Sequence, residues 1–276
     1  GEHSSALVPK FIRRLRLART KIVATFHQPP GIAAKVIDTS VLPWFDAIVL
    51  VSPSQIAYFA QYVPRERLHV LLHGVDAAFF HPPAVERRGT RVRCLTVGHW
   101  LRDFEAFKAA AAAFGNEPGI VFDVVTNRSL GLEEFGNVRI HRNIDDDQLA
   151  DLYRSVDVLF MPLLDSTANN ALLEGIASGL AVVTTDMEST RAYLPRGEAI
   201  FFANNDRDQM IAALSRLQSD SGLRLDLGRR ARQRAEQLAW PAVIREYEAF
   251  YEGIVEAMPV AGAQPEAVRG VTRAEP

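Results

Sequence analysis

Cysteine is almost absent from this sequence, and so is any long apolar run. Cys94 is the one cysteine among 276 residues, which excludes a disulfide framework and favours a reducing, cytoplasmic compartment. No apolar run approaches the roughly 20 residues that a membrane-spanning helix needs. The opening GEHSSALVPK also lacks the pattern of a secretory signal peptide. The hydrophobic content of 48% is that of a globular chain with one large or two ordinary domains.

The sequence also lacks a large excess of positive or negative charge. The formal net charge is -2, which argues against a nucleic-acid partner. The basic segment Phe11–Lys21 carries interleaved apolar residues, and this pattern suits a helix lying on the inner face of a membrane. The alternative is a solvated helix on the first domain. The tail, 259–276, is rich in Pro, Ala and Gly, and we expect it to be disordered.

Short apolar runs alternate with helical patterns along most of the chain, which predicts an α/β fold with parallel sheets covered on both faces. The proline-containing loop that ends near Thr90 divides the pattern into two units. The expected strands are Lys21–Phe26, Ala47–Val51, Leu68–His73, Val92–Val97, Ile120–Val125, Val156–Met161, Leu180–Thr185 and Ala199–Phe202. The expected helices are Phe104–Phe114, Asp147–Ser155 and Asn169–Ser178, with two or three more ending near Met258.

One segment, Ser166–Asp186 (STANNALLEGIASGLAVVTTD), carries the clearest functional signal. Ligands of a parallel sheet bind outside the carboxyl ends of its strands, and this helix begins just after such an end. We expect Ser166 and Thr167 to cap it. The backbone N–H groups of Ala168, Asn169 and Asn170 would then form an anion site. The alternative is an ordinary capped helix.

Glu174 is unexpected within this apolar helix. A carboxylate among buried residues is costly unless it is hydrogen-bonded or faces water. Ribose hydroxyl groups would be suitable donors, and simple exposure to water is the alternative. The small residues Gly175, Ala177, Ser178 and Gly179 would let the helix lie close to a strand.

The segment NNALLEGIASGLAVVTTD resembles the donor-binding segment of the GT-B retaining glycosyltransferases, in particular glycosyltransferase family 4, also called glycosyl transferases group 1. Four further segments resemble the same family, and together they cover roughly residues 20 to 195. They are TFHQPP, LLHGVDAAFFHP, LTVGHWLRDFEAF and LADLYRSVDVLFMPL.

The resemblance implies a GT-B fold, with two Rossmann-like, doubly wound parallel-sheet domains of which the N-terminal one is incomplete. The implied regions are a partial acceptor-side domain at 1–85, a nucleotide-sugar-binding domain at 86–240 and a helix at 241–258 that crosses back to the first domain. The implied activity is metal-independent transfer of a sugar from a UDP- or GDP-linked donor, with retention of configuration. The implied acceptor is a carbohydrate or a lipid-linked sugar, and no cofactor is implied.

Residue by residue, the resemblance assigns Glu174 to the ribose of the donor. Ser166 stands where the family has a glutamate that contacts the donor sugar, so the chain departs from the pattern there. His27 matches a histidine that faces the donor sugar across the cleft. Its alternative role is structural, fixing the turn at Pro29 and Pro30. The implied donor-binding residues are Gly98, His99, Thr167, Ala168, Asn169, Asn170, Ala171 and Glu174.

Arg102 is the best candidate for the cation that neutralises the diphosphate, since a guanidinium suits phosphate. The family usually has an arginine directly after the glycine turn, but this chain has His99 there. The alternative for Arg102 is a surface ion pair with Asp103 or Glu105. Gly74, in the expected interdomain crossing, suggests an unusual backbone geometry.

Two other functions remain open from the sequence. The departures at Ser166 and His99 favour a truncated or degenerate GT-B module that binds a nucleotide or a protein partner without catalysis. A nucleotide-sugar epimerase is weaker, because we can place no additional acid or base carboxylates. We expect no metal site. The acidic run Asp145–Asp147 precedes a helix, where acidic residues interact favourably with the helix dipole.

Overall fold

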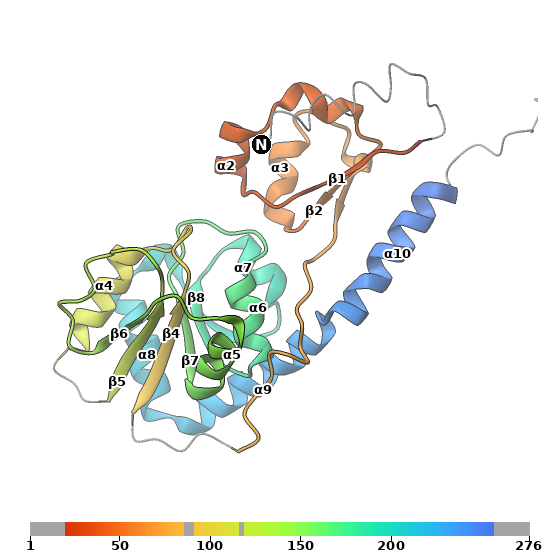
Figure 1. Cartoon of the computed structure of the whole chain (residues 1–276). Coiled ribbons are helices and arrows are strands. Elements are labelled where there is room, and N and C mark those ends of the chain that lie inside the picture. Colours follow the sequence, from red (N-terminus) through yellow and green to blue (C-terminus); the bar gives the residue numbers. More distant parts are fainter. Residues whose placement is uncertain (1–19, 86–90, 116–118, 257–276) are drawn as a thin grey trace, which may run out of the picture.

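The computed structural model describes residues 20–85, 91–115 and 119–256. Two parallel sheets, one small and one large, organise this part of the chain (Figure 1). Most of the basic segment Phe11–Lys21 and the whole tail 259–276 lie outside the described residues, so both expectations about them stay predictions.

The first sheet contains β1 (Val23–Phe26), β2 (Ala47–Leu50) and β3 (Leu68–Val70), in that order and all parallel. All four residues of β2 are buried, which explains why its sequence is continuously apolar. Short helices connect and cover the strands. They are α2 (Pro30–Val36), α3 (Ile56–Phe59) and the 3₁₀ turns η1 (Thr39–Trp44), η2 (Pro53–Gln55) and η3 (Arg65–Arg67).

The second sheet has six parallel strands in the order β6-β5-β4-β7-β8-β9. The chain runs outward from β4 in one direction and then, from β7, in the other, so the topological switch point lies between β4 and β7. Ligands of open α/β sheets bind at such a point. The strands are β4 (Val92–Val97), β5 (Ile120–Val125), β6 (Val138–His141), β7 (Val158–Met161), β8 (Ala181–Thr185) and β9 (Ala199–Phe202).

Helices cover both faces of this second sheet, which confirms the doubly wound arrangement. On one face, α4 (Phe104–Ala113) and α8 (Arg207–Ser219) enclose an aromatic-rich core. On the other face, α5 (Asp146–Ser155), α6 (Asn170–Ala177) and α9 (Ser221–Gln237) pack over the strands. The short helix α7 (Glu188–Tyr193) and the turn η4 (Ala203–Asn205) complete the domain.

Small residues do let α6 approach the sheet closely. A Cβ added at Gly175 would lie 2.7 Å from the side chain of Leu159 in β7. Gly179, which follows α6, has a φ of +69° and lies against Gly228 of α9, where an added Cβ would meet the Gly179 carbonyl oxygen. The glycines therefore fix how α6 and α9 lie on this face.

The last described helix, α10 (Trp240–Glu256), returns to the first sheet (Figure 1). The Trp240 N–H donates to the Val75 carbonyl over 3.1 Å, where the two crossing segments pair. Farther along, the Tyr247 hydroxyl donates to the Leu71 carbonyl over 3.4 Å, and the ring of Phe250 lies 4.8 Å from that of His69. The aromatic residues of α10 therefore contact the segment that links the two sheets and the end of β3.

Our expectation for Gly74 was wrong. Its φ is not among the positive values of the described residues, so no unusual backbone geometry explains the glycine. The reason is close packing, because a Cβ at this position would lie 2.6 Å from the indole of Trp240.

Replacing Gly74 by alanine should lower the free energy of unfolding by about 1–3 kcal/mol, the usual cost of overpacking. Gly136→Ala is the matched control, because a Cβ there meets nothing within 4 Å. Urea unfolding of both variants measures the difference. Equal stability of the two variants would contradict the steric explanation.

Candidate functional site

A cleft of about 580 Å³ lies between the two domains, at the carboxyl ends of β1, β4 and β7. The loops after β4 and β7 border it at the switch point of the second sheet. All the candidate site residues from the sequence line this one cleft. They are His27, Gly98, His99, Arg102, Ser166, Thr167, Ala168, Asn169, Asn170, Ala171 and Glu174.

The start of α6 differs from our expectation. Its N-cap is Asn169, whose side chain accepts a hydrogen bond from the Leu172 N–H over 3.3 Å, and Ser166 and Thr167 are not the caps. The Ser166 hydroxyl donates to the Thr167 carbonyl over 3.3 Å. The Thr167 hydroxyl donates instead to the His27 carbonyl, across the domain boundary. Both predicted caps thus donate to carbonyl oxygens outside the helix.

Backbone donors are concentrated where α6 begins. In the described part of the chain, the N–H groups of the four consecutive residues 168–171 have no hydrogen-bond partner. They border the cleft together with the positive end of the helix dipole. The arrangement can accept an anionic ligand.

Arg102 lies beside these donors. Its guanidinium donates to the Val97 and Trp100 carbonyls over 3.1 and 3.0 Å, and to the Asn169 side-chain oxygen over 3.1 Å. Burial lowers the pKa of Arg102 to about 10, against the opposing effects of Tyr153 and Glu174. The side chain is still charged at neutral pH, and the bond to Asn169 places that charge at the start of α6.

The surface ion pair that we considered for Arg102 does not form. Asp103 caps α4 by accepting from the Ala106 N–H over 2.9 Å. Glu105 pairs with Lys108 over 3.0 Å. The positive charge of Arg102 is therefore directed into the cleft.

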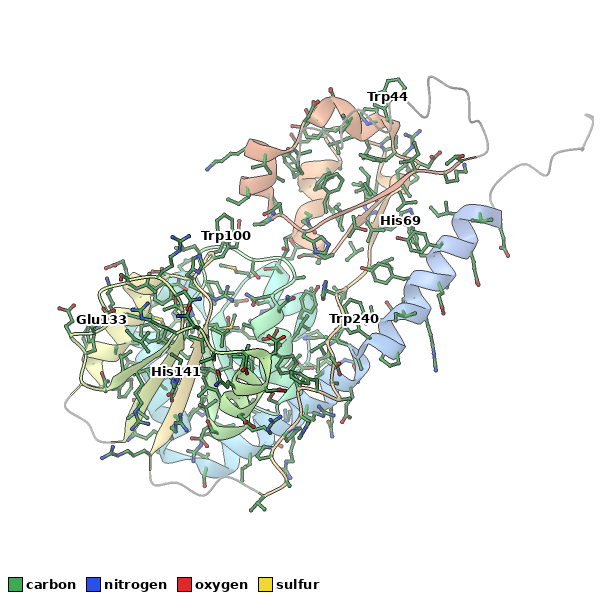
Figure 2. All side chains as sticks on the ribbon, viewed as in Figure 1. Trp44, His69, Trp100, Glu133, His141 and Trp240 are labelled. Atoms are coloured by element: carbon green, nitrogen blue, oxygen red, sulfur yellow. The ribbon has the colours of Figure 1, made fainter. Side chains whose placement is uncertain are left out.

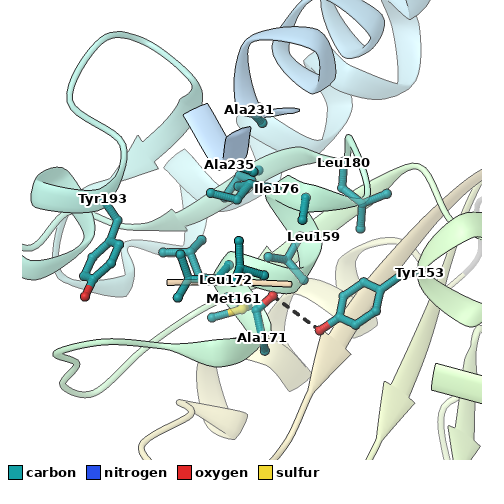
Figure 3. Close-up of a cluster of buried hydrophobic side chains, with 14 of the residues drawn as sticks. Tyr153, Leu159, Met161, Ala171, Leu172, Ile176, Leu180, Tyr193, Ala231 and Ala235 are labelled. Carbon is teal, nitrogen blue, oxygen red and sulfur yellow. Dashed lines mark hydrogen bonds between the residues drawn. The ribbon is translucent and has the colours of Figure 1, made fainter. Parts of the chain in front are cut away.

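Glu174 is half-buried, one turn into α6. Its carboxylate accepts a hydrogen bond from the Tyr153 hydroxyl over 2.9 Å. The same hydroxyl also donates to the Ala171 carbonyl over 3.3 Å, the bond drawn in Figure 3. Burial raises the pKa of Glu174 above its usual value, whereas the Tyr153 hydrogen bond opposes that rise. Tyr153 thus holds a carboxylate that retains acceptor capacity toward the cleft.

His27 lies at the turn after β1, across the cleft from α6. The buried Gln55 amide fixes this turn by donating to the Phe26 and Gln28 carbonyls, over 2.9 Å each. The His27 ring itself makes no hydrogen bond within the described residues. Partial burial and the neighbouring His73 lower the pKa of His27. The turn therefore does not depend on His27, and the imidazole stays available to a ligand.

His73, in the segment that links the domains, packs beside His27. The two rings lie 5.9 Å apart, and His73 packs 4.9 Å from Trp240. His73 Nδ1 is 2.8 Å from the Gly74 carbonyl oxygen, which can only accept, so Nδ1 carries a proton and donates it to this bond.

The glycine turn after β4 shapes the other wall of the cleft. Gly98 has a φ of +80° and donates its N–H to the Val125 carbonyl over 2.9 Å. His99 follows it and accepts the Arg102 N–H through its carbonyl over 3.4 Å. The turn therefore folds Arg102 back toward α6.

The acidic run Asp145–Asp147 forms the N-cap and the first turn of α5. Asp145 caps α5 in a capping box with Gln148. Across residues 20–85, 91–115 and 119–256, no group of three or more His, Cys, Asp or Glu side chains is arranged to hold a metal ion. No described helix is long and apolar enough to cross a membrane.

Sequence reasoning missed several side chains at or beside the cleft, of which three bear on its chemistry. Tyr153 holds Glu174, although it is 21 residues away along the chain. Trp100 and Asp165 line the cleft next to predicted residues. Only Tyr153 left a signal, because it occupies a fixed place in the segment LADLYRSVDVLFMPL that resembles the family.

Comparison with known proteins shows the family to which the chain belongs. Residues 54–220, more than half of the chain, match the family of glycosyl transferases group 1. A phosphatidyl-myo-inositol mannosyltransferase of Mycolicibacterium smegmatis is 32% identical over 43% of this chain. An MMP α-(1→4)-mannosyltransferase of Mycolicibacterium hassiacum is 26% identical over 69%. The matched parts span 31% and 49% of the length of these two relatives.

Solved structures share the fold. Sucrose-phosphate synthase of Thermosynechococcus elongatus aligns with a TM-score of 0.75 at 17% identity, over 92% of this chain and 72% of its own. The Anabaena protein HepE, solved in complex with UDP and glucose, aligns with a TM-score of 0.66 at 13% identity, over 88% and 73%. The expected GT-B fold is thereby confirmed, and the chain belongs to the family of glycosyl transferases group 1.

Proposed function

We propose that the chain transfers a sugar from a nucleoside-diphosphate sugar to an acceptor, with retention of anomeric configuration. One observation carries this proposal. A single interdomain cleft joins four backbone N–H groups that are unpaired within the described residues, the Arg102 guanidinium and the Glu174 carboxylate. The donors and the cation suit a diphosphate, and the carboxylate suits the hydroxyl groups of a ribose.

The role of each cleft residue follows from where negative charge develops during the transfer. As the bond between the anomeric carbon and the diphosphate oxygen breaks, its electron pair moves to that oxygen. The N–H groups of residues 168–171 and Arg102 stabilise the new charge. His27 approaches the sugar from the first domain, with its imidazole held neutral. Attack by the acceptor hydroxyl on the same face gives retention, as in the family that the sequence resembles, and the hydroxyl proton passes to the departing diphosphate oxygen.

The names of two relatives and the ligands of one structural neighbour support specific donor and acceptor substrates for this proposal. Two of them are named mannosyltransferases, one acting on a phosphatidyl-myo-inositol, and a structural neighbour was solved with UDP and glucose. We propose a UDP- or GDP-linked donor and a carbohydrate or lipid-linked acceptor. The reaction would take place in the cytoplasm or at the inner face of the membrane.

Release of nucleoside diphosphate tests the proposal. The chain is incubated with UDP-glucose or GDP-mannose and methyl α-D-mannopyranoside, with and without EDTA. We expect one donor to release its diphosphate, EDTA to leave the rate unchanged, and Glu174→Ala to lower the rate strongly. Proton NMR of the product should show the anomeric configuration of the donor. An inverted product would contradict retention.

Noncatalytic nucleotide binding is the second candidate. It is favoured by Ser166, which stands where the family has a carboxylate and turns its hydroxyl to the Thr167 carbonyl. In that case a diphosphate binds, but no donor is turned over. Calorimetric titration with UDP and GDP, combined with the same incubations, therefore separates the two candidates.

A further inference from the structure

Trp100 and Asp165 lie at the same end of a short pairing between the loops that follow β4 and β7. The two loops run antiparallel at Arg102 and Leu163, and the Leu164 N–H donates to the Leu101 carbonyl over 2.9 Å. In an antiparallel pairing the next residues along are neighbours across the two segments. Here those residues are Trp100 and Asp165, and both line the cleft.

Trp100 is an exposed indole on a fixed loop. Its side chain is 59% exposed, while its carbonyl accepts from the Arg102 guanidinium over 3.0 Å. It lies on the side of the second domain that faces the first (Figure 2). A large aromatic ring left open beside a polar cleft contributes little to folding and offers a flat apolar surface to a ligand.

Asp165 presents one carboxylate oxygen at the mouth of the cleft. Its Oδ1 accepts the Ser166 N–H over 2.8 Å, and its Oδ2 has no hydrogen-bond partner among the described residues. Gly31 of the first domain lies opposite, where an added Cβ would be 4.0 Å from Oδ2. An ionised carboxylate can only accept hydrogen bonds, so hydroxyl groups are suitable partners.

We infer that Trp100 and Asp165 form a binding subsite for a hexopyranose ring. The apolar C–H face of the ring packs on the indole, and ring hydroxyl groups donate to Asp165. Because the Ser166 hydroxyl is bound by its own loop, Asp165 is the carboxylate that this loop offers to a sugar. The inference rests on the proposed function for the source of the ring, which is either the donor sugar or the acceptor.

Calorimetry tests the donor as the source. Each diphosphate, UDP or GDP, is compared with its sugar conjugate, UDP-glucose or GDP-mannose. The variants are Trp100→Ala and Asp165→Asn, with Asp165→Glu to restore the carboxylate. The controls are Trp44→Ala, which removes an exposed indole of the first domain, and Asp208→Asn, which removes an exposed carboxylate at the start of α8.

Saturation-transfer NMR with methyl α-D-mannopyranoside, with and without diphosphate, tests the acceptor as the source. If the ring belongs to the donor, the conjugate binds about tenfold more weakly to Trp100→Ala and Asp165→Asn, while the bare diphosphate is unaffected. If the ring belongs to the acceptor, saturation of its ring protons is lost in these variants and kept in the controls. Either result supports the subsite.

Three results would overturn the subsite. In one, both variants match the controls in both experiments. In another, Trp100→Ala weakens the bare diphosphate and the conjugate equally, because the indole then contacts the nucleoside. In the third, neither sugar probe binds. Diphosphate binding without any effect on sugars would refute this inference alone, whereas failure of every diphosphate to bind would refute the proposed donor site.

Discussion

Replacing Arg102 by methionine should weaken the binding of the cognate nucleoside diphosphate by about 100-fold, or about 2.7 kcal/mol. Truncating one partner of a buried, hydrogen-bonded charge pair costs roughly 2–5 kcal/mol. In the proposed complex Arg102 forms such a pair with the diphosphate, and two carbonyls and Asn169 already hold its guanidinium at the start of α6. Calorimetry at neutral pH measures the change.

Arg139→Met is the matched control, since Arg139 is exposed on β6 and does not line the cleft. The pKa of Arg102 is lowered to about 10 by burial. The affinity of the wild-type chain should therefore fall as pH rises through that value, whereas Arg102→Met should show no such decline. Equal affinities of Arg102→Met and Arg139→Met would show that Arg102 does not bind the diphosphate.

Replacing Glu174 by glutamine should change stability and affinity in opposite directions. Burial raises the pKa of Glu174, so the folded chain carries an ionised group that it disfavours at neutral pH. Glutamine removes that charge and can still accept the Tyr153 hydrogen bond. We expect the free energy of unfolding to rise by about 1 kcal/mol at pH 7. We expect diphosphate affinity to fall about tenfold, because hydrogen bonds to a charged acceptor are lost.

The pH dependence tests the cause of the stability gain. A raised pKa means that the folded state binds more protons than the unfolded state, so stability falls as pH rises from about 4.5, the usual value for Glu, through the raised value. The advantage of Glu174→Gln should therefore vanish below the unfolded pKa. Glu105→Gln is the control, because the Glu105 side chain is 86% exposed. A gain that is independent of pH would contradict the assignment.

The inner strands of the sheets could be predicted from the sequence, but one strand at the edge of the second sheet could not. The run Ala47–Val51 was expected as a strand and contains β2, whose four residues are all buried, because a parallel strand covered on both faces is apolar throughout. β6 was missed. Its sequence, Val138–His141, alternates apolar and basic residues and is only partly buried. It lies at the edge of the sheet, where burial does not select for a continuous apolar run.

The sequence predicted many of the residues that line the cleft. It did not predict which hydrogen bonds they make, because those bonds depend on contacts between elements. Ser166, Thr167 and Asn169 are all good N-cap residues, so sequence alone could not choose among them. The choice is made by tertiary structure, since the Thr167 hydroxyl reaches the His27 carbonyl of the other domain. The partner of Glu174 was hidden for a similar reason, because Tyr153 reaches it only through the packing of α5 against α6.

The most direct test of the donor site is calorimetric titration of the wild-type chain with UDP, GDP and ADP in the absence of metal. We predict that one of the three binds with a stoichiometry of about one, as expected for a single cleft that provides backbone N–H donors, a cation and a carboxylate. That result would also identify the base of the donor. If none of the three binds, the interdomain cleft is not a nucleotide site, and the proposed sugar transfer from a nucleotide donor is wrong for this chain.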